Sequence, residues 1–406
     1  MRIVIADKFA ESARALLAED GHKILFDPGL NGDSLRDALS DENPQMLVVR
    51  STKVDASMLH AASNLALVVR AGAGVNTIDL ETASRMGIYV ANCPGKNAVA
   101  VAELTIGLIL SLDRRIPDNV ADLRAGQWNK KLYGSASGLK GRTLGLIGLG
   151  SIGREVCRRA RAFDMSVVAW GRSLTESQAA ELGITRCESP VAVAAASDIV
   201  SVHVALSGET RGLCDASFFS SMRDGALFIN TARGDIVDEQ ALLDAIETKG
   251  IRAGLDVFDN EPSSGQSSWD SPAGKHASVY GTHHIGASTD QATAAIGAEA
   301  LRVVRAYAKS GTVLNCVNLE PNPAASHTLS IRHKNRVGVL AKVLNELQKA
   351  SLNVLDMENQ LFQWEDAATA TIHLCSEPSS DVLIALQSAS DAILAVRVSA
   401  RGSGQG

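Results

Sequence analysis

The chain has 406 residues, of which 46% are hydrophobic and 21% are charged, and its formal net charge is −6. This length and this balance predict a globular protein of two or three domains and exclude a disordered or fibrous one. The negative net charge also disfavours nucleic acids and anionic membranes as partners.

Cysteine spacing and hydropathy limit the class of protein further. The six cysteines show no CxxC or CxxH spacing, which indicates free thiols in a reducing compartment and no metal site. The opening stretch MRIVIAD is too short for a secretory signal. The longest apolar segment, residues 98–112, contains Glu103 and is shorter than the roughly 20 residues that span a bilayer. We therefore expect a cytoplasmic protein.

Short β-branched runs alternate with helical patterns from the first residues onward. The first series consists of RIVIAD, KILFD, QMLVVRS, LALVVRAG and IYVANCPG. A second series runs from TLGLIGLG, which starts at residue 143, to SVYGTHH, which ends at residue 284. This alternation is typical of parallel sheets with helical crossovers and predicts two doubly wound α/β (Rossmann-like) domains.

The last part of the chain has a different organisation. Residues 319–326, LEPNPAAS, contain two prolines without periodicity, which predicts a linker. Residues 327–400 follow the order strand, helix, strand, strand, helix, strand, which fits the ferredoxin-like βαββαβ motif. Residues 401–406, RGSGQG, are predicted to form a disordered tail.

The stretch GLGSIG matches the dinucleotide-binding pattern G-x-G-x-x-G. It follows a predicted strand and opens a predicted helix, so its glycines can turn the chain and bring a pyrophosphate to the N–H groups of the helix. We therefore predict a nicotinamide dinucleotide site. Its predicted residues are Gly148, Gly150, Ser151, Ile152, Gly153, His203, Thr210, Thr231, Ala232 and Gly286.

The residues beyond this motif bear on the choice of cofactor. An acidic residue that binds the ribose 2′-hydroxyl is expected about 20 residues after the motif. Gly171, Arg172 and Ser173 occupy that place. Arg172 can pair with a 2′-phosphate, which modestly favours NADP over NAD. In the alternative, Arg172 is a solvated charge and the site takes NAD, or both cofactors, through other contacts.

Three ionisable residues follow strands of the second series. Reduction of a 2-oxo acid needs a guanidinium that clamps the carboxylate, a general acid, and a partner that tunes this acid. Arg233, His284 and Glu261 can fill these roles in that order. Each residue taken alone also has a purely structural interpretation. Arg233 could form an ion pair at the end of the sheet, His284 could be a core histidine, and Glu261 could be an exposed loop carboxylate. Their common place after strands of one predicted domain favours catalysis.

The stretches NTARGDIVDEQALLDAI, AGLDVFDNEP and HHIGAST resemble the signatures of the D-isomer-specific 2-hydroxyacid dehydrogenase family. The resemblance extends from about residue 40 to Asn318. It implies that Arg233, Glu261 and His284 are catalytic and that Asp256 meets the nicotinamide carboxamide.

The same resemblance implies a domain arrangement. Residues 1–94 and 287–318 would form a discontinuous substrate-binding domain, and residues 95–286 the dinucleotide-binding domain. His283 stands where the family usually has a proline, so we expect a less rigid loop beside His284.

Two loops of the first series follow predicted strands. The first loop holds Arg50, Ser51 and Lys53, and the second begins at Arg70 and continues through Gly72, Ala73 and Gly74. Cations in the first loop and backbone N–H groups of the second can each bind an anion, and two anionic groups suggest a phosphorylated acid. These segments and NCPGKNAVAVAEL resemble the D-3-phosphoglycerate dehydrogenases within the family. The resemblance also implies substrate contacts from Asn97 and Lys130, although Asn97 can instead cap a helix and the cations of the first loop can be solvated. The predicted substrate residues are Arg50, Ser51, Lys53, Gly72, Ala73, Gly74, Asn97 and Lys130.

Two further features resemble those of the same enzymes. Trp128 is similar to a tryptophan that packs against a neighbouring subunit, which implies a homo-oligomer, a dimer or a tetramer. HKNRVGVLAKVLNELQKASLNV resembles the ACT regulatory domain, although an expected proline is replaced by Val337. This implies that L-serine binds as an effector between paired domains through His333, Asn335 and Asn353. A domain that only dimerises is the alternative.

Together these features predict an NAD(P)-dependent enzyme that oxidises 3-phospho-D-glycerate to 3-phosphohydroxypyruvate, the first step of the phosphorylated route to serine. An NADPH-dependent glyoxylate or hydroxypyruvate reductase, or another D-2-hydroxyacid dehydrogenase, is the nearest alternative. A non-catalytic corepressor that senses dinucleotides is the alternative from another class.

Overall fold

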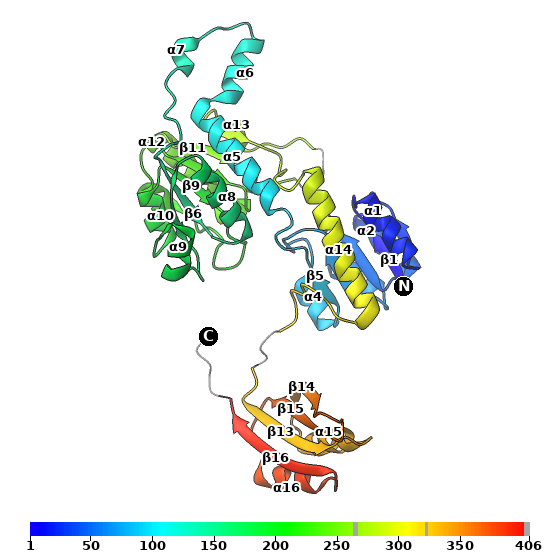
Figure 1. The fold of residues 1–406 in the computed structure, drawn as a ribbon. Helices are drawn as coiled ribbons and strands as arrows, with labels where there is room; N and C mark the ends of the chain where they lie inside the picture. The colour runs from blue at the N-terminus through cyan, green and yellow to red at the C-terminus, as the bar shows by residue number, and fades with distance from the viewer. Residues whose placement is uncertain (263–266, 321–323, 402–406) are drawn as a thin grey trace. The chain divides into compact units, whose positions relative to one another are not determined.

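The computed structural model describes residues 1–262, 267–320 and 324–401. The chain divides into two compact units, Met1–Asn318 and Leu319–Gly406 (Figure 1). The expected tail beyond Arg401 and residues 321–323 of the expected linker lie outside the described residues. All six cysteines lie within the described ranges and are free thiols, as predicted.

The first sheet of the larger unit has five parallel strands in the order β2-β1-β3-β4-β5. This is the order of a doubly wound fold. Its strands are β1 (Arg2–Ile5), β2 (Lys23–Phe26), β3 (Met46–Val49), β4 (Leu67–Arg70) and β5 (Tyr89–Ala91). Its helices are α1 (Glu11–Glu19), α2 (Gly32–Glu42), α3 (Ala56–Ala61), α4 (Leu80–Arg85) and, from much later in the chain, α14 (Asp290–Ser310).

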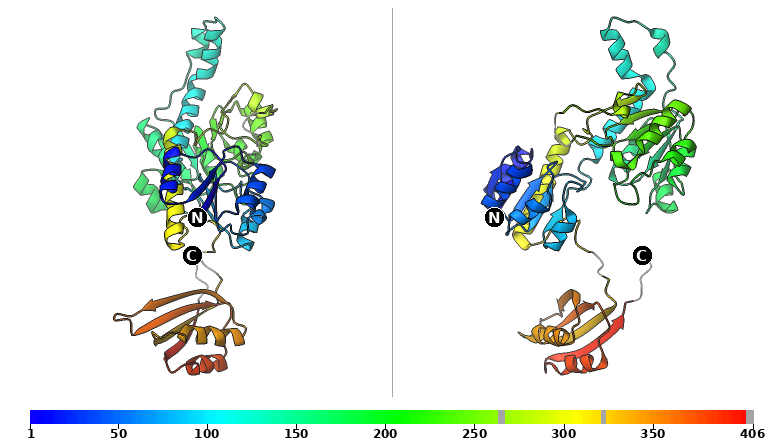
Figure 2. Two further views of the ribbon diagram at one scale, coloured as in Figure 1. Left: turned by 90° about the vertical axis from the view of Figure 1, so that its right-hand side faces the viewer. Right: turned by 180° about the vertical axis from the view of Figure 1, so that it is seen from behind.

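Alternate side chains of these strands enter two separate cores, because successive residues of a strand point to opposite faces. Leu47 and Val68 pack with α2 and α3 on one face. Val48 packs with Ile296 and Val303 of α14 on the other face. Helix α14 thus covers this face of the first sheet together with α1 (Figures 1 and 2).

The second sheet of the same unit has seven parallel strands in the order β12-β11-β10-β9-β6-β7-β8. The chain runs outward from β6 to β8 and then returns to β9 on the other side of β6, which creates a topological switch point between β6 and β9. Ligands of such sheets bind at the carboxyl ends of the strands beside this point. The strands are β6 (Thr143–Ile147), β7 (Ser166–Trp170), β8 (Thr185–Arg186), β9 (Ile199–Val202), β10 (Leu227–Asn230), β11 (Arg252–Leu255) and β12 (Val279–Gly281).

Helices connect these strands and cover both faces of the sheet. They are α5 (Ala98–Arg114), α8 (Ser151–Ala162), α9 (Glu176–Leu182), α10 (Pro190–Ala196), α11 (Ala216–Ser221), α12 (Glu239–Lys249) and α13 (Pro272–Lys275), with a 3-10 turn at Gly234–Ile236. Between α5 and β6, the short helices α6 (Ile116–Arg124) and α7 (Lys130–Tyr133) lead away from the sheet (Figure 1). Helix α6 buries none of its residues, and Trp128 beyond it is 82% exposed.

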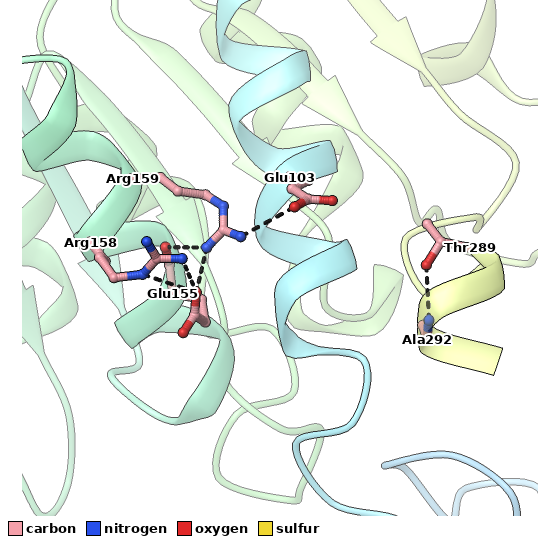
Figure 3. Close-up of polar contacts among 6 residues, drawn as sticks. All are labelled: Glu103, Glu155, Arg158, Arg159, Thr289 and Ala292. Atoms are coloured by element: carbon pink, nitrogen blue, oxygen red, sulfur yellow. Dashed lines mark hydrogen bonds and ion pairs between the residues drawn. The ribbon is translucent and has the colours of Figure 1, made fainter. Parts of the chain in front are cut away.

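Ion pairs fix α8 to α5. The Arg159 guanidinium lies between Glu155 of its own helix and Glu103 of α5, with 3.3 Å between Arg159 Nη2 and Glu103 Oε1 (Figure 3). Arg158 pairs with Glu155 at 2.9 Å, and hydrogen bonds from Arg158 and Arg159 lower the pKa of Glu155. Arg159 in the last turn of α8 thus links this helix to the crossover helix α5.

The smaller unit is an antiparallel sheet in the order β14-β15-β13-β16. Its elements run β13 (His327–Lys334), α15 (Val339–Lys349), β14 (Val354–Leu361), β15 (Ala367–Leu374), α16 (Ser380–Ser388) and β16 (Ile393–Ala400). Alternate residues of β13 and β15, such as Ile331 and Ile372, are buried against Val343 and Leu386 of the two helices. The chain order is βαββαβ, the split βαβ motif.

The predicted fold class is thus confirmed in its coarser form, a parallel-sheet α/β fold followed by an antiparallel sheet. The division of the larger unit at residues 94/95 and 286/287 stays a prediction. Within the ranges described, none of the helices combines the length and the apolar character that crossing a membrane requires.

Candidate active site

The glycine-rich loop joins β6 to α8 at the switch point. Gly148 has a φ of +100°, and a Cβ there would lie 2.8 Å from the carbonyl of His203. A Cβ on Gly153 would overlap the carbonyl oxygen of Gly148. A Cβ on Gly150 would meet nothing within 4 Å. The outer glycines are therefore needed for strand–helix packing, while the middle one faces open space beside the uncapped N-terminus of α8, where a pyrophosphate can approach.

His203, directly after β9, carries an unused polar atom in this region. Its Nε2 lies 2.9 Å from Ser201 Oγ, and its Nδ1 is buried without a partner among the described residues. Burial lowers the pKa of His203 to about 3, so the ring is neutral. Thr210 Oγ1 donates to the Ala205 carbonyl at 2.6 Å and shapes the same loop. Thr231 Oγ1 lies 3.2 Å from Thr105 Oγ1, at the end of β10.

The turn after β7 lies beside the glycine-rich loop, since a Cβ on Gly171 would be 3.7 Å from the Leu149 nitrogen. Arg172, expected to pair with a 2′-phosphate or else to be a solvated charge, has a partner within the chain. Its Nη1 pairs with Glu209 Oε2 at 2.7 Å, and the two side chains are 72% and 74% exposed. No local pattern in the sequence indicates this pair, because 37 residues separate the two along the chain.

His284 and Glu261 form a close pair. His284 Nδ1 lies 2.7 Å from Glu261 Oε2, and Glu261 Oε1 accepts from the Phe258 N–H at 2.9 Å. Burial raises the pKa of Glu261, but the hydrogen bond and charge of His284 and the Phe258 N–H outweigh this, so the pKa is lowered overall. Glu261 is thus held as an anion beside the imidazole. With Nδ1 occupied, Nε2 of His284 is the nitrogen left for proton transfer.

The loop that carries His284 is organised by Asp256, which is 1% exposed. Asp256 Oδ1 accepts from Thr282 Oγ1 at 2.6 Å and from the Ile285 N–H at 2.8 Å, and Oδ2 accepts from the Gly286 N–H at 2.8 Å. These bonds hold His284 in the left-handed region, at a φ of +52°.

The contacts of Asp256 bear on two expectations. They restrain the loop by hydrogen bonds, while the lower rigidity expected from His283 in place of a proline stays a prediction. Both carboxylate oxygens of Asp256 are used within the protein, and a contact to a nicotinamide carboxamide stays a prediction. Gly286 is required locally, because a Cβ there would lie 2.9 Å from Asp256 Oδ2.

Arg233, after β10, points at the loop after β4. Its Nη1 donates to the Ala232 carbonyl at 2.5 Å, and a Cβ on Gly74 would lie 2.5 Å from its Nη2. Burial lowers the pKa of Arg233, while the charge of Glu261 opposes the shift. Gly72, and Ala73 between the two glycines, belong to the same loop.

Arg70, expected at the start of the second loop but not among the predicted substrate residues, is a residue of the site. Its guanidinium fills the space beside Gly72, where a Cβ would overlap Nη1, and its Nε is buried without a partner among the described residues. Burial and the positive charges of Arg233 and Arg50 lower the pKa of Arg70 to about 10. The available signal was an arginine at the end of a strand before a glycine loop. Guanidiniums from both sheets therefore gather in a place that favours anions.

The loop after β3 is held by Asp7. Its Oδ2 accepts from the Arg50 N–H at 2.7 Å, and its Oδ1 accepts from Ser51 Oγ at 2.9 Å. The Arg50 guanidinium reaches toward the chain after His284 and lies 3.4 Å from the Ala287 carbonyl. Lys53 is exposed, and its charge acts on Asp55. The structure thus brings Arg50 to the guanidinium cluster but not Lys53.

Asn97 and Lys130, two further predicted substrate residues, also differ in whether they can meet a ligand at the site. Asn97 precedes α5 without capping it through its side chain, and its Oδ1 is buried without a partner in the described ranges. The helix-cap alternative is therefore wrong, and this oxygen is available to a ligand. Lys130 opens the exposed helix α7, away from the loops after β3 and β4 (Figure 1).

The predicted effector residues lie at two ends of the smaller unit. His333 is buried, and its Nε2 lies 3.1 Å from Asn359 Oδ1. Asn335 Nδ2 donates to the Glu365 carbonyl at 2.9 Å. The strand register places Asn353 at the opposite end of the sheet, since His333 is level with Ala368 on β15. One copy of the chain does not bring the three residues together.

This fold and site define a class: α/β proteins with two parallel sheets, a glycine-rich loop at a switch point and an Arg–Glu–His set. Residues 106–286 match the model of the D-isomer specific 2-hydroxyacid dehydrogenase NAD binding domain. This stretch of the chain therefore resembles the NAD binding domain of the D-isomer-specific 2-hydroxyacid dehydrogenase family.

Curated relatives carry one enzyme name. The chain is 37% identical over 323 residues to the D-3-phosphoglycerate dehydrogenase of Archaeoglobus fulgidus, which covers 79% of this chain and 59% of that protein. It is 35% identical over 351 residues to the rat (Rattus norvegicus) D-3-phosphoglycerate dehydrogenase, over 86% of this chain and 63% of that one. The chain therefore spans about three fifths of the length of the curated relatives it matches.

Solved structures agree with the fold. The TT0316 protein from Thermus thermophilus superposes with a TM-score of 0.69 at 31% identity, over 78% of this chain and 100% of that one. The NAD+-bound 3-phosphoglycerate dehydrogenase of Entamoeba histolytica gives a TM-score of 0.66 at 25% identity, over 79% of this chain and 99% of that one.

Proposed function

We propose that this protein is a D-3-phosphoglycerate dehydrogenase, which oxidises 3-phospho-D-glycerate to 3-phosphohydroxypyruvate. The observation that carries this proposal is the 2.7 Å His284–Glu261 pair beside the clustered guanidiniums of Arg233, Arg70 and Arg50. A site with an acid–base group and several cations suits an acid that carries a second anionic group. The names of the curated relatives support the same reading.

The chemistry assigns one role to each side chain. A bound nicotinamide dinucleotide supplies the acceptor for the hydride that leaves C2. His284 Nε2 accepts the proton of the C2 hydroxyl, and Glu261 stabilises the imidazolium that results. Arg233 binds the carboxylate and orients C2, while Arg50 and Arg70 face the phosphate. Asn97, through its unpartnered Oδ1, holds the substrate as a further polar contact.

The experiment is an assay of full-length protein with NAD+ or NADP+ and 3-phospho-D-glycerate. We expect reduced dinucleotide and 3-phosphohydroxypyruvate in equal amounts. Dinucleotide binding without turnover of any D-2-hydroxy acid would instead support the corepressor alternative.

Removing the charge of Glu261 tests its role as the partner of His284. Glu261→Gln removes the carboxylate that stabilises the imidazolium formed during oxidation, so kcat for oxidation should fall about tenfold or more, the loss of one charge-assisted hydrogen bond. Steady-state rates of the full chain measure this loss. A kcat equal to that of wild type would contradict the role.

For the cofactor, we propose that the site takes NAD(P), with Arg172 as the residue that accommodates a 2′-phosphate. Arg172→Ala is then expected to weaken NADPH binding more than NADH binding, by about tenfold for a lost charge-assisted contact. Dissociation constants from fluorescence titration measure this. Equal losses for the two cofactors would contradict the assignment.

A glyoxylate or hydroxypyruvate reductase is the second candidate, and Arg172 is the observation that favours it. An NADPH-dependent glyoxylate/hydroxypyruvate reductase of Sinorhizobium meliloti, in complex with NADP, superposes with a TM-score of 0.66 at 28% identity. The guanidinium cluster argues for a phosphorylated substrate instead. Lys53 and Lys130 do not strengthen that argument, because neither lies in the cluster.

We also propose a homo-oligomer in a reducing, cytoplasmic compartment. The support is the free thiols and the exposed apolar side chains of the α6–α7 segment, among them Leu123 and Trp128. For the smaller unit we propose an ACT-type regulatory domain, supported by its βαββαβ order.

L-serine inhibition follows from this regulatory proposal. Because Asn353 lies at the far end of the sheet from His333 and Asn335, the site requires two copies whose β14 edges meet. We expect serine to lower the rate, and Asn335→Ala and Asn353→Ala each to raise the serine concentration needed about tenfold. A serine titration without any effect on the rate would contradict the proposal.

A further inference from the structure

Glu209 belongs to the loop that follows β9. Thr210 holds the turn, because its Oγ1 accepts from the Ser207 N–H at 2.8 Å and donates to the Ala205 carbonyl at 2.6 Å. The Gly212 N–H donates to the Asp235 carbonyl at 2.9 Å, which ties the loop to the segment after β10. Glu209 thus extends from a fixed support.

Its partner Arg172 extends from an equally defined turn. The Leu174 N–H donates to the Gly171 carbonyl at 3.1 Å, and the Gly148 N–H donates to the Trp170 carbonyl at 2.8 Å. The turn after β7 is therefore attached directly to the start of the glycine-rich loop.

The Arg172–Glu209 pair crosses the dinucleotide site. Strand β6 lies between β7 and β9, so a contact between the loops that follow β7 and β9 passes over the carboxyl end of β6. In sheets of this order the ribose that bears the 2′-hydroxyl lies by the end of the strand after the glycine motif, here β7. The ion pair therefore stands at the adenosine end of the site.

The pair contributes little to folding. Both side chains are about three-quarters exposed, and exposed ion pairs of this kind are weak because water and salt screen them. Its position beside the ribose gives it a different consequence. A 2′-phosphate, which carries nearly two negative charges, would have to approach Arg172 beside the negative charge of the Glu209 carboxylate, which already occupies Nη1. NAD, which has a hydroxyl there, leaves the pair intact.

We propose that Glu209 is a cofactor-specificity residue that limits the use of NADP by competing with the 2′-phosphate for Arg172. The inference rests on the proposed dinucleotide-dependent function and deepens it. Arg172 attracts the phosphate and Glu209 opposes it, so the two side chains together set the ratio of NADPH to NADH affinity.

The test is a set of fluorescence titrations of NADH and NADPH with the full chain. We expect Glu209→Gln to tighten NADPH binding about fivefold and to leave NADH binding within about twofold of wild type, in line with the strength of exposed charge pairs. In the Arg172→Ala background the same substitution should tighten NADPH binding less, because no guanidinium is released. Raising the salt concentration should reduce the difference.

The chain offers a matched control. Glu81 of α4 pairs with Arg85 at 2.5 Å, and the two side chains are 74% and 78% exposed. Glu81→Gln makes the same chemical change outside the site and should alter neither affinity. If both dinucleotides bind but Glu209→Gln leaves their ratio unchanged, this inference alone is overturned. If neither binds to the wild-type protein, the proposed function falls and the inference falls with it.

Discussion

Replacing His284 by alanine is expected to lower kcat by about 10²–10⁴-fold, the usual contribution of a positioned acid–base group. His284 Nε2 is the nitrogen left for the substrate proton, since Nδ1 is held by Glu261 at 2.7 Å. Steady-state rates in both directions measure the loss. Excess imidazole in solution should restore part of the rate, because the missing group is a proton carrier.

The side chain of His284 is 47% exposed, so its removal should leave the melting temperature and NADH affinity close to those of wild type. A matched control is His276→Ala, because His276 also pairs with a glutamate, Glu247 at 3.0 Å, outside the site. That variant should keep full activity. Retention of wild-type kcat in His284→Ala would remove the proposed base.

Arg233→Ala is expected to lower kcat/KM by about 10²-fold or more, the effect of deleting one partner of a buried charged contact. Arg233→Lys should recover little, because a lysine lacks the planar fork that matches a carboxylate. Stability should not fall in parallel, since the charge of Arg233 already disfavours the charged form of Arg70. Thermal unfolding and steady-state kinetics measure the two effects separately.

Arg85→Ala is the corresponding control, since Arg85 is an exposed arginine on α4. It should leave kcat/KM unchanged. A loss in Arg233→Ala that appears only in the melting temperature would mean that Arg233 acts through folding and not through the substrate.

The parallel sheets, the glycine-rich loop and the approach of Arg233, Glu261 and His284 could be predicted from short stretches of sequence. The apolar strands and the spacing of GLGSIG depend on a few neighbouring residues, so the parallel sheets and the glycine loop were predictable. Arg233, Glu261 and His284 each follow a strand of one sheet, and the carboxyl ends of parallel strands meet at one edge. Their approach was therefore also predictable.

Contacts between distant loops were not predictable in this way. The sequence gives no sign that Glu209 pairs with Arg172, or that Asp256 uses both oxygens on the loop of His284. The Arg70 guanidinium lies beside Gly72, two residues later, and the charge of Arg233 from another sheet lowers its pKa. Each contact depends on how loops from different strands meet, which no local pattern records.

Lys53 and Lys130 were predicted to bind the substrate, but neither lies in the guanidinium cluster. Both carry the right charge, but Lys53 lies toward Asp55 and Lys130 lies on the exposed helix α7. Charge and position after a strand select candidates. The direction of the side chain decides which of them reach the site.

The most direct test of the central claim compares kcat/KM for 3-phosphohydroxypyruvate and hydroxypyruvate with the same reduced dinucleotide. Arginines that face the phosphate should make kcat/KM about 10²-fold or more higher for the phosphorylated acid. Arg50→Met should abolish most of this preference and leave the rate with hydroxypyruvate nearly unchanged. Equal values for the two acids in the wild-type protein would contradict the proposed substrate.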